Sequence, residues 1–161
     1  MLPPLPEWNA AHPALVHFPI GILTIVPLMM IVAALWRKAR LPLSVVTLLV
    51  MIVGTVAAFV VVESGEAAAG LVNDPSEALA ALIHQHAELA ETARSFFAIL
   101  TGCYAVVVIV GGAMGSRLKP LVWEIAHFLL IVACLIGLSI LLTAAYHGGQ
   151  IVHQFGIHAP I

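Results

Sequence analysis

Four long apolar runs, each about the length needed to cross a membrane, constrain this chain more than any other feature. A helix needs roughly 20 apolar residues to cross the hydrocarbon core of a bilayer, and the runs cover about 13–36, 43–69, 93–114 and 121–146. The sequence of 161 residues is 62% hydrophobic and only 9% charged, with a mean hydropathy of +1.11. We therefore expect an all-α integral membrane protein, a four-helix bundle in a single domain over 1–161 with the lipid bilayer as its solvent.

The connections between these runs contain residues that start and stop helices. Pro13 suits a first helical position, and the third run ends at the polar segment 115–120, GSRLKP. Ser76 followed by Glu77 suits a helix start, and the stretch 76–92 alternates apolar and polar residues with helical period. We expect this stretch to form an interfacial helix that leads into the third span.

The second run carries a stripe of small residues suited to close helix packing. The stripe consists of Gly54, Ala58, Val61 and Gly65. Small residues at helical spacing let two backbones approach each other in a membrane. We expect the second helix to pack through this stripe.

The basic residues predict the orientation of the bundle. Five of the six Lys and Arg residues fall in the connections between the first two and the last two runs: Arg37, Lys38, Arg40, Arg117 and Lys119. Because cytoplasmic loops are enriched in Lys and Arg, we expect these connections in the cytoplasm and both termini to be extracytoplasmic. The formal net charge of -2 offers no basic surface to a phosphate backbone, so nucleic acid is excluded as a partner.

Folding the chain in this way gathers most of its histidines at the outer end. Seven of the eight lie there: His12, His17, His84, His86, His147, His153 and His158. Only His127 lies near the cytoplasmic end, and we interpret it as a packing or interfacial residue because no second histidine shares its level. Imidazole is the commonest metal ligand, and ionisable groups inside a membrane are costly enough to indicate function. The outer cluster is therefore the candidate site.

Depth along the helices indicates which of these residues meet. At 1.5 Å per residue, His86 and His147 lie at similar depths near the outer interface and are candidates for opposite ligands of one iron. His17 lies deeper, level with Glu63. His84 and His86 are about 200° apart around a helix axis, so only one of them faces the bundle, and we favour His86.

These residues match the needs of a b-type haem. A haem between helices requires an imidazole on each face, small residues beside the macrocycle and a group that meets its propionates. The cofactor-binding residues expected for haem b are His17, His86 and His147, with Gly148 as a small neighbour. Arg94 is the candidate partner of a propionate, and an ion pair with a nearby glutamate is its alternative role.

Four motifs resemble those of a known family: HPALVHFPIG at 12–21, SGEAA at 64–68, HAELAE at 86–91 and GGQIVHQFG at 148–156. Together they span nearly the whole chain. They resemble the bacterial membrane proteins grouped as domain-of-unknown-function family 2231, which are small four-helix proteins, some joined to or encoded beside c-type cytochrome modules. The resemblance implies a redox setting, and with the expected topology it implies a multi-pass protein of the bacterial cytoplasmic (inner) membrane.

The resemblance also points to particular residues. Matching its motifs position by position selects His12, His17, Glu66 and His86. The last motif of the family usually reads closer to GGxLVYxHG, so His153 stands where Tyr is common and Phe155 where His is common. This departure leaves His147 or His153 as a substitute ligand on the last helix.

Three functions are compatible with this cluster. The first is an electron-transfer subunit rather than a stand-alone enzyme, a b-type cytochrome working between a quinol pool or partner subunit and a periplasmic acceptor such as a c-type cytochrome. The second is a non-haem iron, copper or zinc site, with ligands drawn from His12, His17, Glu66, His86, His147 and His153. The third is a structural or proton-handling subunit of a respiratory complex, and a homo-oligomer is a further candidate assembly.

Overall fold

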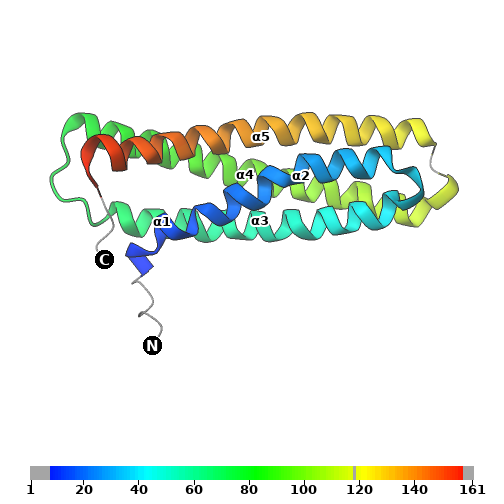
Figure 1. The fold of residues 1–161 in the computed structure, drawn as a ribbon, viewed down its shortest axis with the longest axis horizontal. Helices are drawn as coiled ribbons and strands as arrows, with labels where there is room; N and C mark the ends of the chain where they lie inside the picture. The colour runs from blue at the N-terminus through cyan, green and yellow to red at the C-terminus, as the bar shows by residue number, and fades with distance from the viewer. Residues whose placement is uncertain (1–7, 118, 158–161) are drawn as a thin grey trace.

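The computed structural model describes residues 8–117 and 119–157, and all its regular elements are helices (Figure 1). The long helices are α2 (His17–Leu35), α3 (Arg40–Ala69), α4 (Glu77–Met114) and α5 (Pro120–Phe155). Short helices precede or join them: η1 (Trp8–Ala10), α1 (His12–Leu15), η2 (Arg37–Ala39) and η3 (Gly115–Arg117). Four helical segments, with α1 and α2 counted as one, are long and apolar enough to cross a membrane. The expected all-α, four-helix architecture is confirmed.

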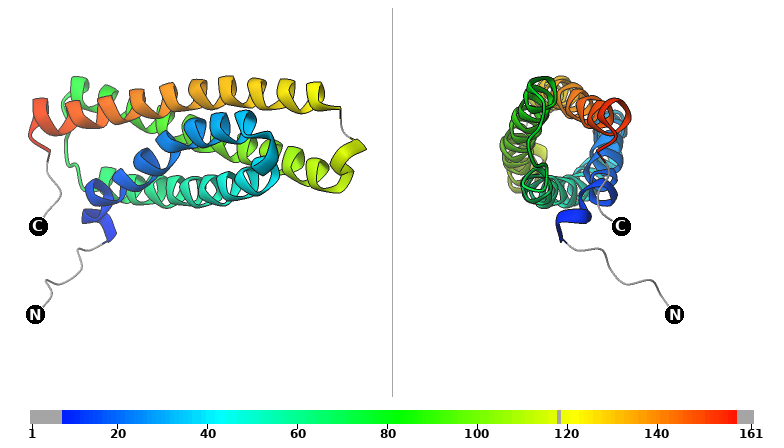
Figure 2. Two further views of the ribbon diagram at one scale, coloured as in Figure 1. Left: turned by 45° about the vertical axis from the view of Figure 1, so that its right-hand side comes forward. Right: turned by 90° about the vertical axis from the view of Figure 1, so that its left-hand side faces the viewer.

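The long helices follow one another around the bundle axis (Figure 2). Each packs against two neighbours, so that α2 lies diagonally opposite α4 and α3 lies diagonally opposite α5. We call the end where α1 begins and α5 finishes the histidine end, and the end that holds η2 and η3 the basic end (Figure 1). Every pair of consecutive long helices is therefore antiparallel.

Large apolar side chains lie both in the core of the bundle and on its outer surface, and several hydroxyl-bearing side chains are buried with them. Leu35 is 78% exposed and Ile99 is 70% exposed, whereas Thr47 is fully buried. The buried Ser and Thr hydroxyls are satisfied internally, for example by the 2.9 Å hydrogen bond between Thr55 and Thr101 that joins α3 to α4. The many exposed large apolar side chains match a lipid-facing surface.

Proline divides the first helical run into two parts. Pro13 lies in the first turn of α1, as expected. Pro19 lacks a backbone N–H, and its ring collides with the carbonyl four residues earlier in a continuous helix. That carbonyl belongs to Leu15, where α1 ends. The helical hydrogen bonding is therefore interrupted between α1 and α2, although Val16 between them keeps helical dihedral angles.

The stretch 76–92 is not a separate interfacial helix, because it is the first half of α4. Its start is as expected, with the Ser76 hydroxyl accepting a hydrogen bond from the Leu79 N–H at 3.3 Å. No Gly or Pro follows until Gly102, so nothing ends the helix. With 38 residues, α4 is about 57 Å long at 1.5 Å per residue. It is therefore longer than the roughly 30 Å hydrocarbon core of a bilayer.

Glycines set the closest approaches between helices. A Cβ on Gly54 would lie 2.6 Å from the Leu23 side chain, so the small-residue stripe of α3 does pack against α2. At the basic end, a Cβ on Gly111 would lie 1.5 Å from the Trp123 ring, and α4 and α5 meet there. Each glycine thus admits one particular side chain from the neighbouring helix.

We predict that Gly111→Ala lowers the melting temperature of the purified protein by several degrees, because the added methyl must displace the buried Trp123 ring and overpacking costs about 1–3 kcal/mol. Gly112→Ala is the matched control, since a Cβ there meets only Leu41 at 3.8 Å. Thermal unfolding in detergent, followed by circular dichroism, compares the two variants. Equal melting temperatures would contradict the packing described for Trp123.

Candidate functional site

Two histidines from diagonally opposite parts of the bundle meet at the histidine end. The ring centroids of His12, on α1, and His86, on α4, lie 6.2 Å apart, and the ring planes are inclined by 82°. Both side chains are partly buried. Residues separated by more than 70 positions in the chain therefore form the centre of the candidate site.

His12 is held by α3. Its Nδ1–H donates a hydrogen bond to the Val61 carbonyl at 3.1 Å, and the Ser64 hydroxyl lies 3.1 Å from the same nitrogen. The Ser64 hydroxyl itself donates to the Val61 carbonyl at 2.8 Å. A Cβ on Gly65 would come within 2.9 Å of the His12 ring, so only glycine leaves the imidazole in this place.

His86 is held by α5 in the same way. Its Nδ1–H donates to the Ala144 carbonyl at 2.8 Å, and a Cβ on Gly148 would lie 3.0 Å from its Cε1 atom. We call each combination of an accepting carbonyl and a glycine that holds an imidazole a cradle. In both cradles the carbonyl and the glycine are four residues apart, one helical turn. The two halves of the bundle thus repeat one arrangement, in which an imidazole lies on a glycine and bonds to the carbonyl one turn earlier.

These hydrogen bonds determine the chemical state of the two rings. A carbonyl only accepts, so the nitrogen that faces it carries the proton, and a neutral imidazole then has an unprotonated Nε2. Histidines that bind metals usually donate their other ring N–H to a carbonyl or carboxylate in this manner. His12 and His86 therefore share the hydrogen-bonding pattern of metal-binding histidines, in which Nε2 is the nitrogen left for coordination.

His147 lies beside this pair. It follows Tyr146 on α5, with the two ring centroids 5.9 Å apart, and it precedes Gly148, which lies against the His86 ring. Its Nδ1 atom is buried and has no hydrogen-bond partner among the described residues. An unsatisfied buried nitrogen is costly, which marks this position as a third candidate ligand.

Other predicted site residues lie outside the pair. His17 is exposed at the start of α2; five residues after His12, it lies about 140° around a helix from it. Arg94 is two turns further along α4 than His86 and stacks over the Phe59 ring at 5.2 Å. Among the described residues it forms no ion pair, so its alternative role as partner of a nearby glutamate is not seen, and its role toward a propionate stays a prediction.

The remaining predicted residues are mostly exposed. Glu66 and His153 both face outward. His84 is also exposed and pairs with Glu88 at 3.5 Å, so His86 is the inward member of its pair, as expected. His158 lies outside the described residues. Within 8–117 and 119–157, no group of three or more His, Cys, Asp or Glu side chains is arranged to hold a metal ion.

The expected haem set did not include His12, although the family resemblance and the metal set did. Matching by helix depth placed His86 correctly at the level of His147, but it favoured His17 over His12 because His17 lies deeper in the membrane. The sequence signal that could have identified the pair His12 and His86 is the two glycines Gly65 and Gly148. They lie in the motifs SGEAA and GGQIVHQFG, and each contacts a histidine of another helix.

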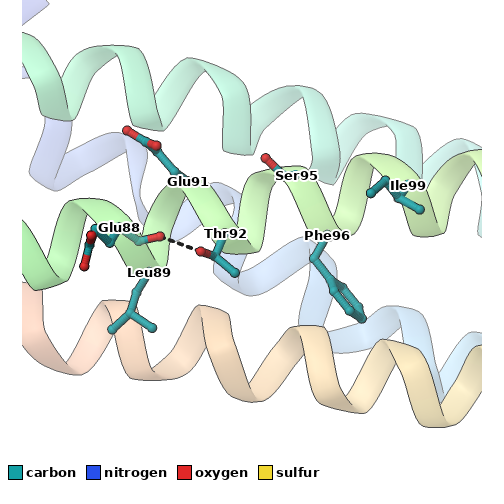
Figure 3. A pocket seen from close by; sticks show the side chains of 7 residues that line it. All are labelled: Glu88, Leu89, Glu91, Thr92, Ser95, Phe96 and Ile99. Atoms are coloured by element: carbon teal, nitrogen blue, oxygen red, sulfur yellow. Dashed lines mark hydrogen bonds between the residues drawn. The ribbon is translucent and has the colours of Figure 1, made fainter.

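A groove on the outer face of α4 contains none of these histidines (Figure 3). It is lined by residues of α4 alone, among them Glu88, Glu91 and Phe96, and the Thr92 hydroxyl donates to the Glu88 carbonyl within it. The groove is open and does not reach the space between His12 and His86.

Comparison with known proteins adds nothing to this geometry: no family model, curated protein or solved structure matches the chain. The description of the site therefore depends on its own contacts.

We predict that Gly148→Ala shifts the His86 ring and weakens its bond to the Ala144 carbonyl, at a cost of about 1 kcal/mol. In the neighbouring control, Gly149→Ala, the added methyl meets nothing within 4 Å. Nitrogen-15 NMR of histidine-labelled protein reports the protonated Nδ1 of His86 directly. An unchanged His86 signal in Gly148→Ala would contradict the close contact between Gly148 and the His86 ring.

Proposed function

We propose that this chain is an electron-transfer protein of the bacterial inner membrane, with one haem b held between His12 and His86. The observation that carries the proposal is the pair of equivalent imidazoles, each oriented by a carbonyl and a glycine of its own half of the bundle. His12 and His86 would hold such a haem through one ring nitrogen each, and the haem iron would supply one-electron chemistry.

The spacing of the two rings supports an iron between them. With metal to nitrogen distances of about 2 Å, two imidazoles on opposite sides of one metal have ring centroids about 6 Å apart, whereas a tetrahedral pair comes within about 5 Å. The observed separation is 6.2 Å. The 82° between the ring planes is compatible with this arrangement, because each imidazole can rotate about its bond to the metal.

Small residues lie near the pair, as a flat macrocycle would require. Next to the two rings, the helices carry Ser64 on α3, Ala90 on α4 and Ala145 and Gly149 on α5, all buried or partly buried. Haem iron alternates between ferric and ferrous states and so carries one electron. The protein's part is to hold both Nε2 lone pairs in place and to keep the two Nδ1 protons on their carbonyls.

Membrane insertion and orientation belong to the same proposal. The exposed apolar side chains of all four long helices suit lipid, and the basic end suits the cytoplasmic side. Both termini and the His12–His86 pair then lie on the extracytoplasmic side. A haem there would be close to a periplasmic redox partner, and quinone and a second copy of the chain remain further candidate partners.

The charge of the histidine end favours a basic partner. Six acidic residues are described there: Glu63, Glu66, Asp74, Glu77, Glu88 and Glu91. Arg94 is the one Lys or Arg among the described residues of that end. Complementary charge steers encounter between redox proteins, so a c-type cytochrome with a basic face is the proposed acceptor.

We predict that protein expressed with sufficient haem and purified in mild detergent contains one haem b per chain, with a sharp α-band after dithionite reduction. His12→Ala and His86→Ala should each abolish this low-spin spectrum, because one axial ligand is lost. His84→Ala is the matched control on α4, since its side chain is exposed. Visible spectra and a pyridine haemochrome assay measure the outcome.

A colourless wild-type protein would reject the haem proposal. The unpartnered Nδ1 of His147 favours a second candidate, a single iron, copper or zinc ion bound by His12, His86 and His147 after the His147 ring turns. Elemental analysis of the same sample would then find stoichiometric metal that His147→Ala removes. If the purified protein contains neither haem nor metal, the third function, a structural or proton-handling subunit, is the one that remains.

A further inference from the structure

A second groove lies at the basic end of the bundle, where α2 and α5 are neighbours (Figure 1). We call it the α2–α5 groove. It has a volume of about 400 Å³ and is open toward the outside of the bundle. Both helices line it with residues on one face of each, and most of the lining is apolar: Ile31, Ala34, Leu35, Phe128 and Ile131, with Arg37 and Glu124 toward the end of the bundle. The groove is therefore apolar along its length and charged at one end.

The groove has the depth of a lipid headgroup and the first part of an acyl chain. Glu124 and Ile131 are seven residues apart on α5, which is about 10 Å at 1.5 Å per residue. Trp36, just before Arg37, is 60% exposed, and Trp is enriched where a membrane meets water. In the membrane orientation proposed above, the charged end of the groove lies at the level of headgroups and its apolar part lies in the hydrocarbon.

The charged end presents one arginine outward. Arg37 donates a hydrogen bond to the Glu124 carboxylate and its side chain is 71% exposed. Arg40 lies 3.8 Å from the same carboxylate oxygen, but its side chain is only 13% exposed and donates to the Ala34 carbonyl at 3.1 Å. A guanidinium carries five N–H groups, so Arg37 can bond to Glu124 and to a phosphate at the same time.

The charge of the basic end favours an anionic ligand. Five cations are described there, Arg37, Lys38, Arg40, Arg117 and Lys119, and Glu124 is the one described carboxylate. Arginine pairs its N–H groups with phosphate oxygens, and basic pockets between membrane helices on the cytoplasmic side bind acidic lipid headgroups.

We propose that the α2–α5 groove binds an anionic phospholipid of the cytoplasmic leaflet, with its phosphate at Arg37 and one acyl chain between α2 and α5. A free phosphate ion would meet Arg37 but leave the apolar lining uncovered. The proposal rests on the membrane insertion and orientation proposed above and is independent of the haem.

Native mass spectrometry of the full-length protein in detergent tests the site, with phosphatidylglycerol and phosphatidylcholine of identical acyl chains as probes. Phosphatidylglycerol should bind about tenfold more tightly, and Arg37→Gln should remove this preference, because a charge-assisted hydrogen bond to phosphate is lost. Arg117→Gln is the matched control, since it removes an exposed cation of the same end that does not line the groove. It should keep the preference.

A second pair of variants tests the apolar part. Ala34→Phe fills the groove without a change of charge and should weaken phosphatidylglycerol binding, whereas Ala113→Phe adds the same bulk at an exposed position of α4 and should not. Melting temperatures confirm that all four variants fold; an exposed ion pair such as Arg37–Glu124 contributes little to stability.

Three results would overturn the site: equal binding of the two lipids, equal effects of Arg37→Gln and Arg117→Gln, or displacement of phosphatidylglycerol by inorganic phosphate. Alkaline extraction of the membranes separates this failure from a failure of insertion. Protein released by the extraction would overturn both insertion and the lipid site, whereas retained protein without lipid preference would overturn the site alone.

Discussion

Helices surrounded by lipid gain little from apolar contact with one another, so such a bundle depends on close approach at small residues and on buried hydrogen bonds. In this chain five glycines lie where the helices approach each other most closely: Gly54, Gly65, Gly111, Gly137 and Gly148. Each faces large side chains of a neighbouring helix, and at Gly65 and Gly148 that side chain is a histidine. The contacts that hold the bundle together are therefore the same contacts that orient its polar groups.

The two halves of the chain contribute equally to the histidine site. In the first half, α1 supplies His12 and α3 supplies its cradle; in the second half, α4 supplies His86 and α5 supplies its cradle. Each imidazole is thus oriented within its own half. The pair itself exists only when the halves pack across the bundle diagonal, so the site is formed by tertiary packing of two similar units.

The bundle has a different polar centre at each end. At the histidine end the Nδ1–H groups of His12 and His86 bond to carbonyls, and unprotonated nitrogens remain available to a metal. At the basic end the buried ring of His127 bonds to the Trp123 carbonyl and the Ser44 hydroxyl. The imidazoles of the first centre therefore keep one ring nitrogen outside their hydrogen bonds to the helices, whereas the imidazole of the second is bonded within the bundle through both nitrogens.

The sequence by itself determined the four helices, their approximate ends and the sorting of histidines and basic residues to opposite ends of the bundle. These are properties of linear segments, since hydropathy, helix caps and loop charge are read along the chain. Only the tertiary structure decided that His12 rather than His17 faces His86, and that 76–92 continues into α4. Which side chain faces inward depends on the rotation of each helix about its axis, and that rotation follows from the glycine contacts between helices.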